Sequence, residues 1–163
     1  IAIVLGPALE RLGLPTIAAH LFVVYFGVLS VVTPPVALAA FAAAPIAGAK
    51  PMETGFEAVR LAIAGFIIPF IFVYHQDVLI IIDGFKLNGL LWAVFVFVIS
   101  SWLIGTGLSG YDTRHMLIWE RVLRLIVGIT VLFPDFLISV PSVIIAIIII
   151  GWHKFGNRKL VSD

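Results

Sequence analysis

Cysteine is absent from the sequence, so the chain has no disulfide framework and no thiolate that could bind a metal ion or attack a substrate. The hydrolase motifs Gly-x-Ser-x-Gly and His-Glu-x-x-His are also absent, as are paired intramembrane aspartates. The net charge is only +1, and the Lys and Arg residues form no dense cluster beside aromatic residues. These absences argue against an enzyme, a cofactor and a nucleic-acid partner.

Charged residues are scarce. They make up 12% of the 163 residues, whereas 62% are apolar and the mean hydropathy is +1.20. An ordinary soluble domain has about 25% charged and about 45–50% apolar residues. So few charges could not cover a soluble globule without exposing large apolar patches, which promote association. We therefore expect an all-α integral membrane protein whose solvent is membrane lipid.

The sequence starts at Ile1 rather than Met and is hydrophobic from there on. A cleaved signal peptide is one source of such a start, but residues 1–5 have no basic region and no small-residue cleavage site nearby. We therefore expect a fragment whose missing part lies upstream.

A broken helix is predicted between residues 17 and 47, because this apolar run exceeds the ~20 residues of one straight span. Its middle reads Ser-Val-Val-Thr-Pro-Pro at residues 30–35. Proline removes a backbone donor, and the residue before it avoids the helical conformation, so Pro34 and Pro35 should leave two half-helices of about a dozen residues each.

Broken helices near the bilayer midplane form the ion and substrate sites of many secondary transporters. The first half-helix offers carbonyl oxygens to a small cation, and the second offers amides and a positive dipole end to an anion. Gly27 permits close backbone approach, while Ser30 and Thr33 add neutral oxygens. The alternative is a tolerated proline kink in which both hydroxyls only satisfy freed backbone groups.

A membrane helix is predicted over residues 56–74. Thr54 and Glu57 fit a capping box at its start, and Pro69 should kink it near its far end. Glu57 and Arg60 should share one face at its polar entrance.

Two further apolar stretches follow. Residues 87–105 predict a span with Trp92 and Trp102 near its ends, as interfacial anchors would lie. Residues 122–152 are interrupted by Pro134 and Asp135, and fit either one kinked helix or a hairpin of two short helices.

The Lys and Arg residues decide between these two arrangements. If residues 122–152 cross the membrane once, five basic residues lie on each side of the membrane. If they cross it twice, eight lie on one side and two on the other. The eight are Lys50, Arg60, Arg114, Arg121, Arg124, Lys154, Arg158 and Lys159. The positive-inside rule favours the hairpin. It predicts that Asp83 and Asp135 lie outside, with residues 111–114 and the C-terminus in the cytoplasm.

The Thr-Pro-Pro element lies in an apolar context that extends over residues 19–41. Similar sequence continues in residues 47–48, 51–52, 54–56, 58–61, 66–70 and 72–74. Together these segments, about half of the chain, resemble the fused permease subunit of TRAP (tripartite ATP-independent periplasmic) transporters, particularly those paired with TAXI-type binding proteins.

The resemblance implies a sodium-coupled, elevator-type importer that crosses the bacterial inner membrane several times. Such a permease takes an anionic solute, often a carboxylate, from a periplasmic TAXI-type solute-binding protein. The candidate ion and substrate-site residues are Gly27, Ser30, Thr33, Pro34 and Pro35. They belong to the second broken helix of the transport domain, with sodium near Ser30 and Thr33, and no other metal is implied.

Residues 1–86 then form the C-terminal part of the transport domain, in contact with the rest of the permease chain. Residues 87–163 form a C-terminal membrane extension. The alternative is a structural or assembly subunit that does not transport; a passive anchor, however, does not require the break at residues 30–35.

Other polar residues have plainer interpretations. His20 could couple transport to protons, but a packed or interfacial histidine is favoured. Glu10 and Arg11 are expected in a surface loop. Residues 75–77 (His-Gln-Asp) follow a span and lack a second histidine at ligand spacing, so a solvated loop is preferred to a metal site.

Overall fold

The computed structural model describes residues 2–80 and 85–155. These residues form helices joined by turns, with no strand among them, which confirms the all-α fold. The chain divides into two compact units, Ile1–Ala93 and Val94–Asp163.

The first unit contains the predicted broken helix. It begins with α1 (Ala2–Arg11) and α2 (Thr16–Leu29); α2 continues into the 3-10 turn η1 (Ser30–Val32), and helix resumes as α3 (Leu38–Ile46). Between η1 and α3 the backbone is extended at Thr33, the Pro34–Pro35 peptide bond is cis, and Ala37 has a positive φ of 36°. The helix therefore breaks where two prolines follow Thr33, as the sequence predicted.

The next segment departs from the prediction at its start. Helix α4 (Pro51–Leu61) begins five residues before the predicted Phe56, with Pro51 in the first turn, where a missing N–H costs nothing. Thr54 Oγ1 donates to the carbonyl of Lys50 at 3.0 Å instead of capping the helix. The predicted capping box is therefore wrong, although Arg60 does donate to Glu57 as the shared face required.

The predicted helix 56–74 is also not continuous. Helix α5 (Ile63–Tyr74) follows α4 after Ala62, and the two are bent by 47°. This bend precedes Pro69, which lies buried inside α5. The 3-10 turn η2 (Gln76–Leu79) follows α5, in the stretch that was expected to be a loop.

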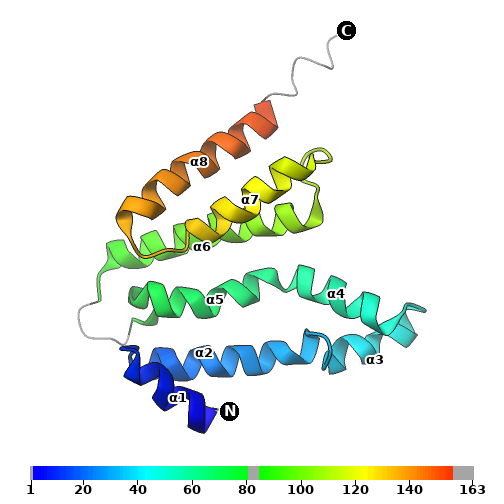
Figure 1. Cartoon of the computed structure of the whole chain (residues 1–163), viewed down its shortest axis with the longest axis horizontal. Helices are drawn as coiled ribbons and strands as arrows, with labels where there is room; N and C mark the ends of the chain where they lie inside the picture. Colours follow the sequence, from blue (N-terminus) through cyan, green and yellow to red (C-terminus); the bar gives the residue numbers. More distant parts are fainter. Residues whose placement is uncertain (1, 81–84, 156–163) are drawn as a thin grey trace. The chain divides into compact units, whose positions relative to one another are not determined.

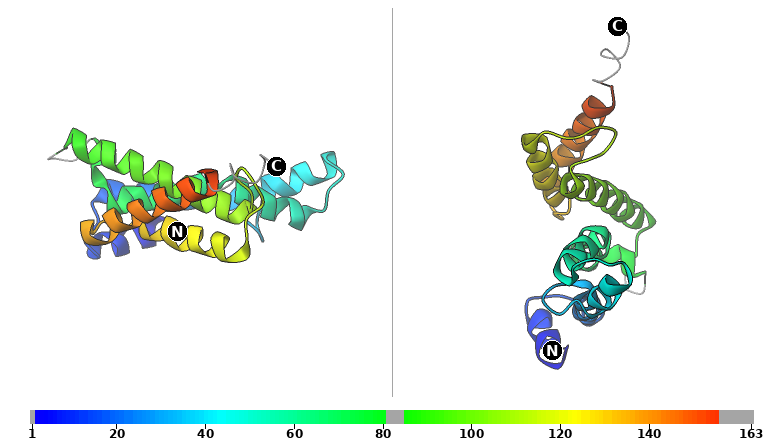
Figure 2. Two further views of the ribbon diagram at one scale, coloured as in Figure 1. Left: turned by 90° about the horizontal axis from the view of Figure 1, so that it is seen from above. Right: turned by 90° about the vertical axis from the view of Figure 1, so that its right-hand side faces the viewer.

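The two bent rods of the first unit run side by side. Helix α2 packs against α5, and α3 packs against α4 (Figure 1 and Figure 2). Aromatic rings fill the α2–α5 contact, where the ring centroids of Phe22 and Phe70 are 5.7 Å apart and those of Tyr25 and Phe72 are 5.4 Å apart. These edge-to-face pairs hold the rods in register on the α2 side of the break.

Glu10 and Arg11 lie in the last turn of α1, so their assignment to a surface loop is wrong. Arg11 suits this position because its positive charge faces the negative end of the helix dipole. The turn after α1 passes through Gly13, whose φ of 93° favours glycine and whose amide donates to the carbonyl of Glu10 at 2.9 Å.

A close approach joins α4 to the break. A Cβ atom added at Gly55 would lie 2.8 Å from Cγ of Pro34 and 3.4 Å from Cε1 of Phe41. The pyrrolidine ring cannot rotate away as a flexible side chain would. Gly55 therefore allows α4 to pack closely against Pro34.

We expect Gly55→Ala to destabilise the first unit by about 1–3 kcal/mol, because the added methyl overpacks a rigid contact. Thermal unfolding of the purified chain in detergent measures this effect. Gly27→Ala is the matched control, since α2 offers open space there, with no atom within 4 Å of an added Cβ. Equal melting temperatures for the two variants would contradict the close packing of α4 on Pro34.

The second unit contains most of α6 (Leu87–Ser109), followed by α7 (Ile118–Thr130) and α8 (Phe136–Phe155). Helices α7 and α8 pack against each other in opposite directions, which confirms the predicted hairpin (Figure 1). Asp135 lies in the turn, where its side chain accepts a 2.9 Å hydrogen bond from the amide of Leu137 and so caps α8.

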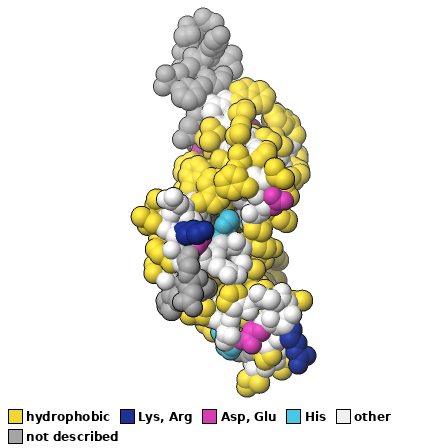
Figure 3. All heavy atoms as spheres, turned by 90° about the vertical axis from the view of Figure 1, so that its left-hand side faces the viewer, with side chains coloured by type: hydrophobic (Ala, Val, Ile, Leu, Met, Phe, Trp, Pro, Cys, Tyr) yellow, Lys and Arg dark blue, Asp and Glu magenta, His cyan; other side chains and the backbone are white. Residues whose placement is uncertain are grey.

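Two helices of the described residues are long and apolar enough to cross a membrane, Leu87–Ser109 and Phe136–His153; the bent pair α4–α5 would be a third. Hydrophobic side chains cover much of the face in Figure 3. Ile46, Leu61 and Leu137 are each at least 85% exposed in this chain. Such exposure suits lipid or further protein rather than water.

The predicted orientation in the membrane stays a prediction. Asp83, Arg158 and Lys159, on which part of it rests, lie outside the described residues, as does the side chain of Lys154. The domain assignment of residues 1–86 and 87–163 also stays a prediction.

Candidate functional site

Both predicted hydroxyl groups lie at the end of the first half-helix. Ser30 Oγ donates to the carbonyl of Gly27, and Thr33 Oγ1 donates to the carbonyl of Leu29, each at 2.6 Å. These are the local bonds that Ser and Thr make to freed helical carbonyls. Each hydroxyl oxygen keeps lone pairs after donating its proton, so the bonds fix the oxygens in place without preventing them from binding a cation.

The two prolines separate these oxygens from the next helix. The amide of Ala37 bonds to the carbonyl of Thr33 at 2.9 Å and closes the turn around Pro34 and Pro35. Helix α3 then begins at Leu38 with no side-chain cap on its first turn. The first amides of a helix have no partner within it. The break thus brings carbonyl and hydroxyl oxygens near a helix N-terminus, whose dipole favours an anion.

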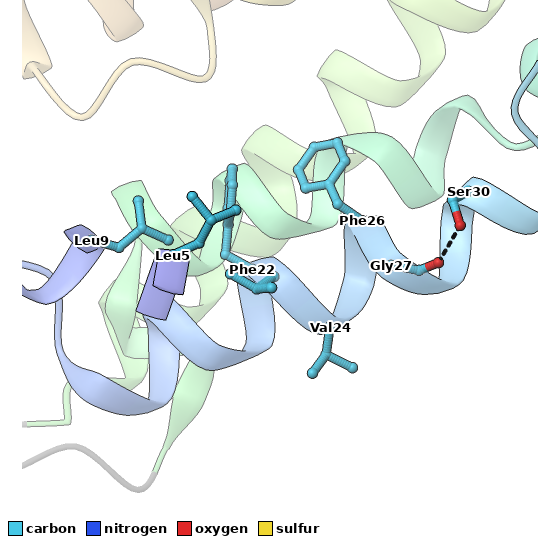
Figure 4. Close-up of a pocket in the computed structure, with 8 residues that line it drawn as sticks. Leu5, Leu9, Phe22, Val24, Phe26, Gly27 and Ser30 are labelled. Atoms are coloured by element: carbon cyan, nitrogen blue, oxygen red, sulfur yellow. Dashed lines mark hydrogen bonds between the residues drawn. The ribbon is translucent and has the colours of Figure 1, made fainter. Parts of the chain in front are cut away.

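The space beside Gly27 is open. A cavity of about 550 Å³ lies between α1 and α2 and is lined by Leu5, Leu9, Phe22, Val23, Val24, Phe26, Gly27 and Ser30. Figure 4 shows α1 contributing Leu5 and Leu9, and the Ser30 hydroxyl bonded to Gly27 at one end. Its walls are almost entirely apolar, so this cavity by itself has no charged group that would hold an anionic solute.

His20 lies close to an acidic group from another helix. Its Nδ1 is 2.8 Å from the carbonyl of Thr16 and 3.8 Å from Oε1 of Glu10. The side chain is about half exposed, and the structure does not bring it to the break. No group of three or more His, Asp or Glu residues that could hold a metal ion occurs in the part of the chain that the structure describes.

Residues 1–88 match the family described as the tripartite ATP-independent periplasmic transporter, DctM component. The match covers more than half of the 163 residues and includes the broken helix, its prolines and Gly55. This chain belongs to the DctM family. No curated protein and no solved structure matches it.

Membership of the DctM family makes the chain a membrane component of a TRAP transporter, as the sequence resemblance predicted. The family is a class of transporters rather than of enzymes, and its members work with a periplasmic binding protein and other subunits. All five predicted site residues lie within the DctM match. Ser30 and Thr33 lie at the end of the first half-helix, next to Pro34 and Pro35, and Gly27 lies one turn before Ser30.

A second polar cluster lies beyond the DctM match, and the sequence analysis missed it. Arg124 is fully buried, and its guanidinium bonds to Asp112 at 3.1 Å, to Glu120 at 3.4 Å and to the hydroxyl of Thr106 at 2.8 Å. Glu120 also accepts from Nδ1 of the buried His153 at 2.6 Å. Three helices and one loop therefore meet in a charged network.

The sequence contained a signal for this cluster. Glu120 and Arg124 are four residues apart, on one face of a helix, and charged residues inside membrane segments usually pair with one another. The positive-inside prediction instead places Arg124 among the basic residues at the cytoplasmic surface. Arg121 also has a local role, since it donates to the carbonyls of Gly107 and Leu108 and so satisfies the end of α6.

Proposed function

We propose that this chain forms part of the transport domain of a sodium-coupled importer in the bacterial inner membrane. The importer would take an anionic organic solute from a TAXI-type periplasmic solute-binding protein. The observation that carries the proposal is the break between α2 and α3, where the hydroxyl oxygens of Ser30 and Thr33 lie beside the last carbonyls of a half-helix.

Sodium is a small, hard cation, and neutral oxygens can replace its water. The carbonyls of Gly27 and Leu29 and the two hydroxyl oxygens come from one short segment, and their mutual hydrogen bonds keep them in place. Unwound backbone at membrane depth is tolerated where it is buried in protein or lines a cavity. A coupling ion at this point would therefore use backbone that a continuous helix would have satisfied internally.

The start of α3 is the reason to propose an anionic solute. Its unpaired amides and dipole favour negative charge, and the prolines place it immediately after the candidate sodium ligands. Transporters with broken helices bind coupling ions at half-helix C-termini and substrate carboxylates at half-helix N-termini. The rest of the permease chain would supply further ligands.

A structural subunit without transport activity is the second candidate. It is favoured by one observation: both hydroxyls already donate to backbone carbonyls, as a simple proline break requires. Ion dependence separates the two candidates, because a passive subunit has no reason to respond to sodium.

Solute uptake by the complete transporter should depend steeply on an inward sodium gradient. Cells or proteoliposomes that contain the permease and its binding protein are assayed with sodium, and again with potassium in its place and the proton gradient collapsed. Uptake should fall to background in potassium. Undiminished uptake there would exclude sodium coupling, and absence of uptake under every condition would favour the structural subunit.

A further inference from the structure

The α7–α8 hairpin contains a pocket that the transport proposal does not use. Its volume is about 370 Å³, within the range of small-molecule sites. It is lined by Arg114, His115, Leu117, Trp119, Glu120, Trp152 and His153. These residues belong to the loop before α7, the first turn of α7 and the end of α8, which meet at one end of the unit (Figure 1).

A buried polar atom in the wall of this pocket has no partner. His153 is 1% exposed, its Nδ1 lies 2.6 Å from Oε1 of Glu120, and its Nε2 makes no hydrogen bond among the described residues. A buried polar atom without a partner costs free energy. Nε2 itself is shielded, so a ligand in the pocket reaches it after a small shift of the His153 ring, and the ligand then removes that cost because Nε2 can form a hydrogen bond.

Basic groups beside His153 fit an anion. Arg114 and His115 are exposed and line the pocket, and the carboxylate of Glu120 is already bonded to Arg124 and to Nδ1 of His153. The loop that carries the basic groups is ordered by a 3.0 Å bond from the amide of Met116 to the carbonyl of Gly110 and by a bridge between Tyr111 and His115. The backbone that carries the basic groups is therefore ordered before a ligand arrives.

Two tryptophans beside the pocket suit a membrane surface. The rings of Trp119 and Trp152 lie 5.9 Å apart and are both more than half exposed. Trp152 is one residue before the end of the apolar segment Phe136–His153, and tryptophan is enriched where the headgroups meet the hydrocarbon. Exposed isoleucines such as Ile145 and Ile148 continue along α8 from this end and offer an apolar surface for acyl chains.

We propose that this pocket binds the headgroup of one anionic phospholipid that carries hydroxyl groups, as phosphatidylglycerol does. The phosphate lies against Arg114 and His115, and the headgroup hydroxyls meet Nε2 of His153. Basic pockets at helix ends recognise lipid headgroups by this chemistry. The site is independent of the proposed sodium coupling, and its occupancy is measured without transport.

Native mass spectrometry of the full chain in detergent tests the proposal by titration with dioleoyl phosphatidylglycerol. His153→Asn keeps a donor near the position of Nδ1, for Glu120, but has no atom at Nε2. Arg114→Gln removes an exposed charge without disturbing the buried network. Arg114→Gln should weaken the binding of the first lipid about tenfold or more, through loss of a bond to the charged phosphate, and His153→Asn about two- to tenfold, through loss of one hydrogen bond to a neutral hydroxyl.

Arg11→Gln is the control, because it removes an exposed arginine from the other unit and should leave the first binding step unchanged. Dioleoyl phosphatidylcholine, which lacks the net charge and the hydroxyls, should bind at least tenfold more weakly. Unaltered phosphatidylglycerol binding by Arg114→Gln, or an equal loss in Arg11→Gln, would overturn the proposal. Displacement of the lipid by equimolar glycerol 3-phosphate would assign the pocket to a soluble anion instead.

Discussion

Arg124→Met should lower the free energy of unfolding of the second unit by about 3–5 kcal/mol, the largest stability effect we expect in this protein. The substitution leaves the carboxylates of Asp112 and Glu120 buried, with side chains no more than 8% exposed and without their shared cation. A lone buried charge is costly because it has lost its water and its counterion. Denaturation by increasing SDS, followed by tryptophan fluorescence, measures the change.

Arg114→Met is the matched control, because the exposed Arg114 lies ten residues away in the same unit. Exposed substitutions usually change stability by about 0.5 kcal/mol or less. The triple variant Arg124→Met, Asp112→Asn, Glu120→Gln should recover part of the loss, since it removes the uncompensated charges as well. A loss in Arg124→Met no greater than that in Arg114→Met would mean that water or lipid headgroups reach the network.

Thr33→Val should weaken the sodium dependence of uptake about five- to hundredfold, which corresponds to ~1–3 kcal/mol for one missing ligand or hydrogen bond at a dehydrated site. Valine has the shape of threonine but lacks Oγ1, which lies 2.6 Å from the carbonyl of Leu29. The variant should still insert and express, because valine is at least as compatible with lipid. Uptake at a series of sodium concentrations measures the change.

Thr130→Val supplies the control for the loss of a local hydrogen bond. Thr130 Oγ1 donates to the carbonyl of Val127 at 3.0 Å near the end of α7, so the substitution removes a bond of the same kind far from the break in sequence. It should leave the sodium dependence at the wild-type value. Wild-type sodium affinity in a well-expressed Thr33→Val permease would return the break to a simple proline kink.

The break between α2 and α3 and the cluster around Arg124 differ in the kind of polar group they contain and in how far apart in sequence those groups lie. At the break, neutral oxygens are fixed by bonds between residues three or four positions apart. In the second unit, charged and ionisable side chains are brought together from residues up to 33 positions apart. The first arrangement suits an ion that must enter and leave, whereas the second suits a fixed connection between α7, α8 and the loop that precedes them.

The sequence by itself determined the features that depend on neighbouring residues. Composition decided the membrane environment, because a chain with 12% charged residues has too few of them to cover its apolar side chains in water. Pro34 and Pro35 decided the position of the break, since a proline acts on its own backbone and on the residue before it. Pro134 and Asp135 likewise marked the hairpin turn. The sequence around Thr33 was enough to indicate the family that the match over residues 1–88 then showed.

Tertiary structure alone decided the features that require distant residues to meet. Leu29 lies 3.3 Å from a Cβ added at Gly65, and Pro34 lies against Gly55. Gly55 and Gly65 lie on either side of Ala62 in the sequence. The 47° bend between α4 and α5 therefore lets this pair of helices follow the broken helix formed by α2 and α3. No proline or glycine at Ala62 marks the bend, which follows the packing of α5 on α2 and of α4 on α3. Arg124 looked like a surface anchor for the same reason: its partners Asp112 and Thr106 come from other segments, and only packing shows that the charge is buried.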